Sequence, residues 1–483
     1  MSSTRHCRAA RGADVAPLVR IIAARHLPIA SLALLGLSLA PAAMAASITV
    51  TGPAVDDVVN GNCSIVEAVR AANNNAAVDG CAAGSGADVI VLPASGSFSF
   101  DGSKLFGLGS QNALPEVSSN ITLQGNGSTL ARSSSASADF RIASVTGSGK
   151  LTVQDTTITG GRSEGSGGAL FSGSETTLSL VRSKVSNSYS ADYGGGIFAM
   201  GVLTVTNSSI SGNTASQSGG GVYMYGDGAK ATVTGSTISG NTAFAYGGGV
   251  YAAGGASATI TNSTVSGNAV STDDNGYGGG MALRYSAATL TNSTITGNRA
   301  GPGNGGGVNS YGSEVAMRNS IIARQRGGRN CVSDSPLAAA GAINLDDKDG
   351  STCEGFSVSV TGFLLAALAD NGGPTLTHAL TKPDSDAAID AGDNTVCATD
   401  LPSGAGNVDQ RGRPRSAGAR CDLGAFEYQP PVAPPPPPSD GGSTGTPPPA
   451  SGDGGGGGGN FGFVALLGLG ALWLRRRLRL RSG

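Results

Sequence analysis

Short runs in which polar and apolar residues alternate recur at a nearly constant interval through the middle of the chain. The clearest copies end in Ser-Gly-Asn or Thr-Gly-Asn and begin at Leu203, Ala231, Ala258 and Ala288, with weaker copies from Leu151 and Leu178. The intervals between Asn187, Asn213, Asn241, Asn268 and Asn298 are 26, 28, 27 and 30 residues. Alternation with period two predicts β-strands. A repeat of roughly 20–50 residues made of short strands predicts a solenoid.

Each unit has three apolar positions that form columns if the rungs stack about 4.8 Å apart. The expected columns are Ile210, Ile238, Val265 and Ile295; Val205, Val233, Ile260 and Leu290; and Val222, Val250, Met281 and Val308. Three columns predict three sheets, the cross-section of a parallel β-helix. We expect nine or ten rungs between residues 85 and 330, over a length of roughly 45 Å.

Asparagines are expected at two corners of the rungs. Asn213, Asn241, Asn268 and Asn298 should stack at one corner, where Asn tolerates the left-handed conformation and hydrogen-bonds to the next rung. A second corner should hold Asn207, Asn262 and Asn292, with Gly235 replacing Asn once. A residue repeated in every rung is better explained by architecture than by sugar binding. For the same reason the glycine triplets are not phosphate-binding loops.

The alternation of Ser-Gly-Asn with Gly-Gly-Gly-Val-Tyr resembles the repeats of polymorphic outer-membrane proteins. More broadly, it resembles the pectin-lyase-like superfamily of right-handed β-helices. The resemblance implies an all-β fold, a right-handed parallel β-helix over residues 85–330. It also implies that polysaccharide is the class of ligand to consider.

Residues 46–84 are expected to cap the first rung. Cys63 to Asn73 predicts a short helix, because Ser64 and Glu67 have the capping-box spacing and the apolar residues fall on one face. This segment resembles the CSLREA motif found at the start of exported β-helix proteins, although Ile65-Val66 stands where that motif has Leu-Arg.

Residues 331–429 are expected to form a disulfide-bonded C-terminal cap. Four motifs follow in order: Asp370 to Thr375, Ala388 to Gly392, Asp409 to Gly412 and Cys421 to Glu427. The set resembles the choice-of-anchor Q domain, which closes β-helices ahead of surface-sorting tails. That family is named for its position and not for an activity.

The two ends of the sequence predict export and sorting. Residues 1–45 have a basic region, a short apolar run and Ala43-Met44-Ala45, which predict a signal peptide cleaved between Ala45 and Ala46. Residues 430–460 are a Pro/Gly-rich linker, and residues 461–483 are an apolar segment followed by an Arg cluster. This tail resembles the GlyGly-CTERM signals of Gram-negative bacteria, which implies a sorting protease that cuts in the glycine run. The alternative is a plain membrane anchor.

Composition and net charge narrow the class of protein and the kind of partner further. Glycine makes up about 16% of the 483 residues, and 13% are charged. Ten of the 31 basic and one of the 33 acidic residues lie in the two ends, which leaves the body with 21 and 32 and a net charge near −11. An acidic body excludes nucleic acid as the expected partner. The expected location is the cell surface or outer membrane.

Six cysteines remain outside the leader, an even number that predicts disulfides in an exported chain. Six cysteines allow fifteen pairings. Their positions form three close couples, which favours Cys63–Cys81, Cys331–Cys353 and Cys397–Cys421. The short Cys-x-x-Cys spacing of a zinc site is absent from the sequence.

Residues for catalysis are few. His6 and His26 lie in the leader, so His378 is the one histidine of the body, which argues against Ser-His-Asp and Cys-His chemistry. The candidates for a lyase or hydrolase are Asp273, Asp274 and Arg284. Asp192-Tyr193 stands at an equivalent turn, Arg299 is a further basic candidate, and Asp346 to Asp349 predicts an acidic loop without full calcium-loop spacing.

The sequence therefore predicts an exported, surface-anchored and non-catalytic protein that contacts polysaccharide or a neighbouring cell, as an adhesin does. No cofactor and no metal are expected. The alternative is a polysaccharide lyase or glycoside hydrolase that uses Asp273, Asp274 and Arg284. A third alternative is a passive spacer without a ligand.

Overall fold

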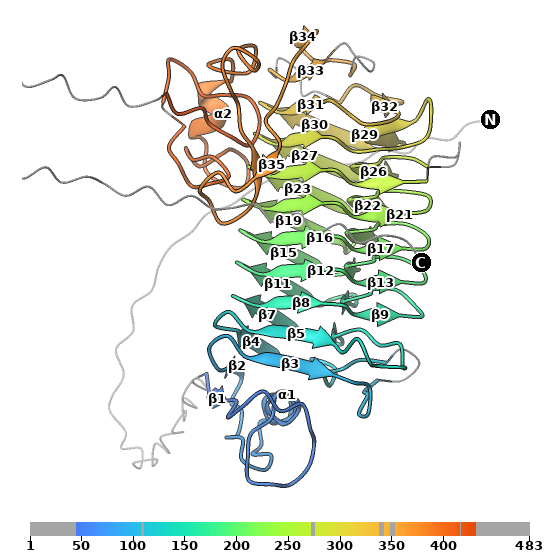
Figure 1. Cartoon of the computed structure of the whole chain (residues 1–483), viewed down its shortest axis with the longest axis vertical. Helices are drawn as coiled ribbons and strands as arrows, with labels where there is room; N and C mark the ends of the chain where they lie inside the picture. The colour runs from blue at the N-terminus through green and yellow to red at the C-terminus, as the bar shows by residue number, and fades with distance from the viewer. Residues whose placement is uncertain are drawn as a thin grey trace, which may run out of the picture. The chain divides into compact units, whose positions relative to one another are not determined.

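The computed structural model describes residues 45–107, 111–271, 276–337, 342–347, 353–415 and 417–430. The predicted signal peptide (except Ala45), most of the linker and the apolar tail fall outside these ranges. The described chain winds into a parallel β-helix with three long sheets (Figure 1). Every neighbouring pair of strands in these sheets is parallel, as a solenoid requires.

The ten-stranded sheet consists of β1 (Ser47–Thr49), β2 (Ala87–Val91), β4 (Asn120–Gln124), β7 (Lys150–Gln154), β11 (Thr177–Val181), β15 (Val202–Thr206), β19 (Lys230–Thr234), β23 (Ser257–Thr261), β27 (Ala287–Thr291) and β30 (Glu314–Arg318). The eleven-stranded sheet consists of β3 (Ser97–Phe100), β5 (Thr129–Arg132), β8 (Thr157–Thr159), β12 (Lys184–Ser186), β16 (Ser209–Ser211), β20 (Thr237–Ser239), β24 (Thr264–Ser266), β28 (Thr294–Thr296), β31 (Ile321–Ala323), β33 (Leu345–Asp347) and β34 (Val358–Val360).

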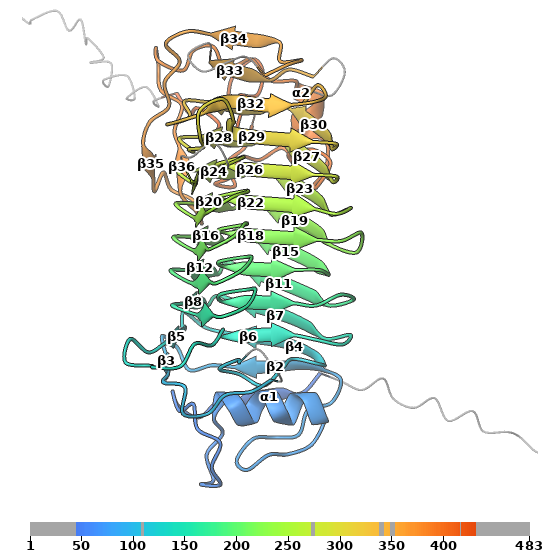
Figure 2. The same cartoon turned by 90° about the vertical axis from the view of Figure 1, so that its right-hand side faces the viewer.

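The eight-stranded sheet consists of β6 (Ala143–Val145), β10 (Leu170–Ser172), β14 (Ile197–Ala199), β18 (Val222–Tyr225), β22 (Val250–Ala253), β26 (Met281–Arg284), β29 (Gly305–Tyr311) and β32 (Arg329–Ser333). A fourth, minor ladder of two-residue strands was not predicted: β9 (Arg162–Ser163), β13 (Tyr189–Ser190), β17 (Thr214–Ala215), β21 (Thr242–Ala243) and β25 (Ala269–Val270). Figure 2 shows the ten- and eight-stranded sheets as neighbouring stacks.

The three predicted columns are confirmed. Ile210, Ile238, Val265 and Ile295 pair in register in the eleven-stranded sheet. The column from Val205 to Leu290 lies in the ten-stranded sheet, and the column from Val222 to Val308 lies in the eight-stranded sheet. All three columns point inward and form one continuous hydrophobic core. Stacking lets each short rung bury apolar side chains that it could not bury alone.

The asparagine column of the Ser-Gly-Asn motif forms, but not in the expected conformation. Each Nδ2 donates to the next Oδ1, at 3.0 Å from Asn213 to Asn241 and 2.9 Å from Asn241 to Asn268. The left-handed residue at this corner is the preceding glycine, as in Gly212 at φ 66° and Gly240 at φ 63°. Glycine accepts this conformation without steric cost, so the asparagine itself is free to turn its amide inward.

Asn187 does not belong to the asparagine ladder, although it continues the spacing of the ladder asparagines in sequence. Ser186 pairs with Ser211, so Asn187 aligns with Gly212 and takes the left-handed position at φ 52°. Ser188 stands where the ladder asparagine would be, and its amide nitrogen donates to Asn213 Oδ1 at 3.0 Å. At the other end of the ladder Gln325 replaces asparagine and accepts from Asn298.

The glycine triplets fit closely against this ladder. A methyl group added at Gly249 would lie 2.6 Å from Gly280 O and 3.0 Å from Asn268 Nδ2. A side chain has no room there, because the buried amide and the next rung occupy the space. The two repeated motifs, Ser-Gly-Asn and Gly-Gly-Gly, are therefore one packing unit, which agrees with an architectural role.

The N-terminal end is covered by α1 (Ile65–Asn74), as Figures 1 and 2 show. Its capping box forms, because Glu67 N donates to Ser64 Oγ at 3.2 Å and Ser64 N donates to Glu67 Oε2 at 2.9 Å. The segment predicted as a cap also contains β1, which pairs with β2. The ten-stranded sheet thus begins before residue 85.

The expected C-terminal cap has two parts. Residues 331–360 close the end of the solenoid, with Leu337 and Phe356 packed against the main core. Residues 361–430, here called the C-terminal flank, pack instead along the side of the upper rungs (Figure 1). The flank contains α2 (Asn394–Ala398) and an antiparallel pair, β35 (Leu368–Ala369) and β36 (Thr377–His378).

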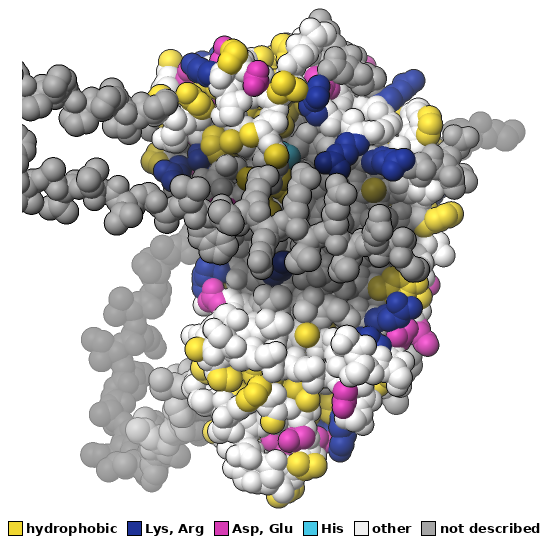
Figure 3. All heavy atoms as spheres, in the orientation of Figure 1, with side chains coloured by type: hydrophobic (Ala, Val, Ile, Leu, Met, Phe, Trp, Pro, Cys, Tyr) yellow, Lys and Arg dark blue, Asp and Glu magenta, His cyan; other side chains and the backbone are white. Residues whose placement is uncertain are grey.

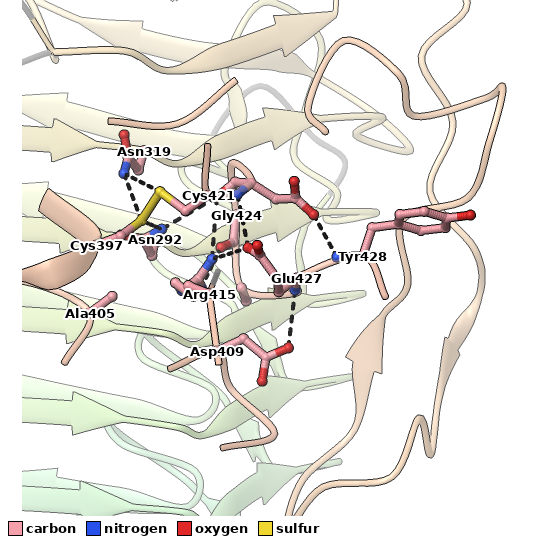
Figure 4. A network of polar contacts seen from close by, with 12 residues as sticks. Asn292, Asn319, Cys397, Ala405, Asp409, Arg415, Cys421, Gly424, Glu427 and Tyr428 are labelled. Atoms are coloured by element: carbon pink, nitrogen blue, oxygen red, sulfur yellow. Dashed lines mark hydrogen bonds and ion pairs between the residues drawn. A yellow bond between two sulfur atoms is a disulfide. The ribbon is translucent and has the colours of Figure 1, made fainter. Parts of the chain in front are cut away.

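Three disulfides are present, and they are the three close couples: Cys63–Cys81, Cys331–Cys353 and Cys397–Cys421. Cys397–Cys421 joins two segments of the flank beside the solenoid (Figure 4). Asn292 and Asn319 of the β-helix donate their Nδ2 groups to Cys397 Sγ, each at 3.3 Å. The disulfide therefore also contributes to the contact between flank and β-helix.

A buried polar network joins the last two flank motifs to each other and to the β-helix (Figure 4). The Arg415 side chain is fully buried; its Nη2 donates to Asn262 Oδ1 at 3.0 Å and to Gly424 O at 2.9 Å, and its Nη1 lies 3.6 Å from Glu427 Oε2. Arg411 pairs with Asp409 at 2.7 Å. With Asp422 the cluster holds three carboxyl groups against two guanidinium groups, so one carboxyl group lacks a cationic counterpart.

This imbalance predicts a pH-dependent flank. Burial raises the pKa of Glu427 to about 7 and the pKa of Asp422 to about 6, and attraction to Arg415 only partly opposes this. In the unfolded chain both values are about 4, so between these limits the folded flank binds more protons. The free energy of unfolding should therefore fall as the pH rises from about 5 to about 8. Urea unfolding of the flank, followed by hydrogen exchange at four pH values, measures this.

The matched control for the pH series is Glu427→Gln, which removes the titrating group of higher pKa. The variant should show a flatter dependence above pH 7, where Asp422, with its pKa of about 6, is already largely ionised. A wild-type flank that gains stability from pH 5 to pH 8 would contradict the assignment.

Candidate functional site

The outer face of the eight-stranded sheet carries a column of aromatic rings. Phe171, Phe198, Tyr223 and Tyr251 occupy one outward position on successive rungs. Their ring centroids are 5.3, 5.2 and 5.1 Å apart, close to the spacing of the strands. The first three rings are nearly parallel, so they bury one another's faces; Tyr223 is only 8% exposed. This part of the column stabilises the sheet more than it offers ring faces to a ligand.

The column stops after Tyr251. The next two rungs carry Ala282 and Asn309 at the same position. A pocket of about 210 Å³ lies at this level, where the rings end. It is lined by Tyr246, Tyr277, Ala282, Leu283, Arg284, Asn309 and Tyr311.

The pocket combines aromatic walls with one cation. Tyr246 and Tyr277 stack with centroids 5.2 Å apart, and Tyr311 is 52% exposed. The Arg284 guanidinium lies 6.0 Å from the centroid of Tyr246 and 5.9 Å from that of Tyr285. Burial raises the pKa of Tyr251 beneath the pocket, so its hydroxyl stays protonated at neutral pH. The pocket can therefore offer ring surfaces, hydroxyl groups and a guanidinium.

The structure brings together some of the residues proposed from the sequence. Arg284 ends β26 and lines the pocket, and Tyr277 lies beside it. Asp273 and Asp274 lie outside the described residues, between Ser271 and Gly276. Arg299 is exposed and is not among the residues that line the pocket. Tyr193 stacks on Tyr223 at 4.9 Å, two rungs below Ala282.

The prediction of an acidic loop at Asp346 to Asp349 is wrong for Asp346 and Asp347, the two of these residues that the structure describes. Asp346 and Asp347 belong to β33 and are buried. Asp346 Oδ2 accepts from Cys353 N, and Asp347 accepts from Asn330 Nδ2 and Arg324 N. Burial raises the pKa of Asp346. These carboxyl groups close the C-terminal end by accepting hydrogen bonds from nearby backbone and side-chain groups. Lys348 and Asp349 lie outside the described ranges.

His378 is isolated in sequence but not in space. Its Nε2 lies 2.7 Å from Ser266 Oγ, and its Nδ1 lies 2.7 Å from Ala366 O. This arrangement requires a proton on Nδ1, because a carbonyl only accepts. Burial lowers the pKa of His378, which keeps the ring neutral. Because Ser266 is itself buried, the contact serves to hold the flank on β24.

Among the described residues, no group of three or more His, Cys, Asp or Glu side chains is placed to hold a metal ion. Within the same ranges, no helix combines the length and the apolar character needed to cross a membrane. On the face that Figure 3 shows, the described residues carry scattered charged side chains between areas of uncharged polar side chains and backbone.

Fold and pocket together define a right-handed parallel β-helix with an aromatic outer face. A family model described as "Right handed beta helix region" matches residues 141–336, which contain most of the rungs. Among solved structures, "Crystal structure of pectate lyase Pel9A" matches with a TM-score of 0.46 and 15% sequence identity, covering 80% of this chain and 96% of that chain. No curated protein matches the sequence significantly.

Proposed function

We propose that this chain is an exported, surface-anchored β-helix protein that binds acidic polysaccharide without cleaving it, through the pocket at the end of the aromatic column. The observation that carries the proposal is the juxtaposition of Arg284 with Tyr246, Tyr277 and Tyr311 around one ring-sized gap. A volume of about 210 Å³ is below the roughly 300–1,000 Å³ of sites for drug-sized ligands, so it suits one sugar ring of a longer chain.

The chemistry of the lining supports an acidic sugar. An aromatic ring presents an apolar face to the C–H groups of a pyranose, while tyrosine hydroxyls and the Asn309 amide can meet its hydroxyl groups. A guanidinium recognises a carboxylate through charge-assisted hydrogen bonds. Export, signal cleavage between Ala45 and Ala46, and anchoring by residues 461–483 belong to the same proposal and rest on the sequence patterns. The three disulfides favour an oxidising compartment.

Arg284→Ala should weaken binding of polygalacturonate, an acidic polymer, by roughly 10- to 100-fold, the equivalent of about 1.5–3 kcal/mol for a hydrogen bond to a charged group. Affinity electrophoresis measures the dissociation constant, with neutral dextran as the control polymer. Tyr246→Ala should weaken binding of both an acidic and a neutral pyranose chain, because it removes ring surface.

Arg299→Ala is the matched control, since it removes an arginine that does not line the pocket. It should leave polygalacturonate binding unchanged. Equal binding by the wild type, Arg284→Ala and Tyr246→Ala would refute the proposed site. Equal losses of affinity in Arg284→Ala and Arg299→Ala would show that the weaker binding comes from the lower positive charge of the protein and not from the pocket.

The alternative activity is cleavage of the same polymer. It is favoured by the position of Arg284 in the pocket and by the closeness in sequence of Asp273 and Asp274 to Tyr277. Mass spectrometry of polygalacturonate after incubation separates the two functions. Unsaturated or water-added oligomers that disappear in Asp274→Ala would establish an enzyme, whereas an unchanged polymer supports binding without catalysis.

A further inference from the structure

Asp88 is a buried carboxylate without a cationic partner near the N-terminal end of the β-helix. It lies on β2 and is 1% exposed. It pairs in register with Ile121, and Leu151 and Leu178 hold the same inward position on the next rungs. Within the described ranges, no lysine, arginine or histidine forms an ion pair with Asp88. A charge at an otherwise apolar position is costly unless nearby groups compensate it.

Hydrogen bonds compensate only one oxygen of this carboxylate. Asp88 Oδ1 accepts from Ser85 N at 2.8 Å and from Ala46 N at 3.2 Å. Asp88 Oδ2 is buried and accepts no hydrogen bond from the part of the chain that the structure describes. A methyl group added at Gly84 would come within 2.5 Å of this oxygen, so the space around it is closed. The two donors are neutral amides, and the negative charge of Asp88 has no counterion.

The pairing of β1 with β2 holds Ala46 beside Asp88. Val89 N donates to Ala46 O at 2.8 Å, and Ile48, two residues further along, is fully buried. Ala45 is exposed, whereas Ala46 is half-buried. The cleavage site expected from the sequence lies between these two alanines. The nitrogen that cleavage would free is therefore the one that already contacts the carboxylate.

We propose that removal of the leader turns the Ala46 nitrogen into an ammonium group that forms an ion pair with Asp88. The inference rests on the cleavage that belongs to the proposed function. Hydrolysis of the Ala45–Ala46 peptide bond adds the hydroxyl group of water to the Ala45 carbonyl carbon and the remaining hydrogen to the Ala46 nitrogen. The free amine then takes a proton from solvent, because an α-amino group is mostly protonated at pH 7.

Processing would in this way complete the N-terminal cap. In the uncleaved chain the Ala46 nitrogen is an amide and leaves the charge of Asp88 uncompensated. In the processed chain the same contact is charge-assisted, and such hydrogen bonds are roughly twice as strong as neutral ones. The pair joins β1 to β2, the two strands against which α1 packs (Figure 2). Removal of the leader is thereby coupled to the stability of the first rung.

The reactivity of the N-terminal amine tests the pair in the chain isolated after export. Peptide mass spectrometry identifies the first residue and then follows its acetylation at pH 7. A nearby carboxylate favours the protonated, unreactive amine, so Ala46 should react about tenfold more slowly in the wild type than in Asp88→Asn. The matched control is Asp79→Asn, which changes a carboxylate of the same cap that accepts from Asn60 N and Gly61 N. It should leave the rate unchanged.

A second variant leaves Asp88 in place. One glycine inserted between Ala45 and Ala46 moves the new amine about 3.8 Å along the chain and keeps the Ala46 nitrogen as an amide. The amine of the inserted glycine should react about tenfold faster than the wild-type Ala46 amine. The Val50 amide, which donates to Val91 O, should exchange its hydrogen about fivefold faster. In the Asp88→Asn background the insertion should change neither rate.

The outcomes separate the pair from the cleavage on which it rests. A processed chain that begins at Ala46 but reacts equally fast in the wild type, in Asp88→Asn and in the insertion variant would overturn the pair alone. Equally slow reaction in the wild type and Asp88→Asn would also overturn it, because burial would then be the cause. A chain that keeps its leader, or begins at another residue, would overturn the cleavage and the pair together.

Discussion

Asn241→Ala should be among the most destabilising single substitutions in the β-helix, with an expected loss of about 3 kcal/mol or more in the free energy of unfolding. Asn241 is 0% exposed, and its Oδ1 accepts from both Nδ2 and the backbone nitrogen of Asn213 at 3.0 Å. Its Nδ2 donates to Ile210 O and Asn268 Oδ1, each at 2.9 Å. Alanine leaves these groups buried without partners, at about 1–3 kcal/mol each. Urea unfolding followed by circular dichroism measures the loss.

Asn187→Gly is the matched control. Asn187 continues the 26-to-30-residue spacing of the ladder in sequence, but it takes the left-handed position that glycine holds in the next rung. Glycine fits that conformation, so the change should stay within about 0.5 kcal/mol. If the two substitutions cost the same, the ladder would not be the source of the stability.

The rungs could be predicted because the information that specifies them is local and repeated. Alternation within Thr204-Val205-Thr206 defines the inward side chain, and the recurrence of the unit fixes which residues stack. The helix at Ser64 and the three disulfides were also readable, since a capping box spans three residues and each cysteine couple spans 18 to 24. The error at Asn187 arose because spacing alone cannot separate neighbouring residues of one turn.

The pocket and the contacts of the flank could be predicted from the sequence only in small part. The pocket forms because Ala282 has no aromatic ring at the position that Tyr223 and Tyr251 occupy on the two rungs below. Comparing the residue after each third-column position would have revealed the gap. The flank gives no such signal, because its hydrogen bonds to the β-helix join residues far apart in sequence, 112 positions in Ser266 with His378 and 173 in Thr237 with Gln410. Without periodicity, a sequence does not show which face such a segment covers.

Arg415→Ala should release the flank from the β-helix, with a loss of about 3–5 kcal/mol in the stability of that segment. The Arg415 side chain is fully buried and donates to Val408 O, Asn262 Oδ1 and Gly424 O. Its removal leaves these acceptors without their donor and the carboxyl group of Glu427 without its nearest cation. Hydrogen exchange should show faster exchange at flank amides such as Gln410 N and Ala425 N, with the lower rungs unchanged.

Arg182→Ala is the comparison that isolates burial as the cause. Arg182 also pairs with a carboxylate, that of Asp155, in better geometry than Arg415 with Glu427, but both residues of the Arg182–Asp155 pair are open to water. Exposed pairs contribute about 0–1 kcal/mol, so this variant should unfold almost as the wild type does. Adding Glu427→Gln to Arg415→Ala should recover part of the loss, because it removes the carboxyl group that Arg415 lies nearest to and so lowers the uncompensated buried negative charge. If Arg182→Ala proved as costly as Arg415→Ala, or if Glu427→Gln gave no recovery, then the buried network would not be what holds the flank on the β-helix.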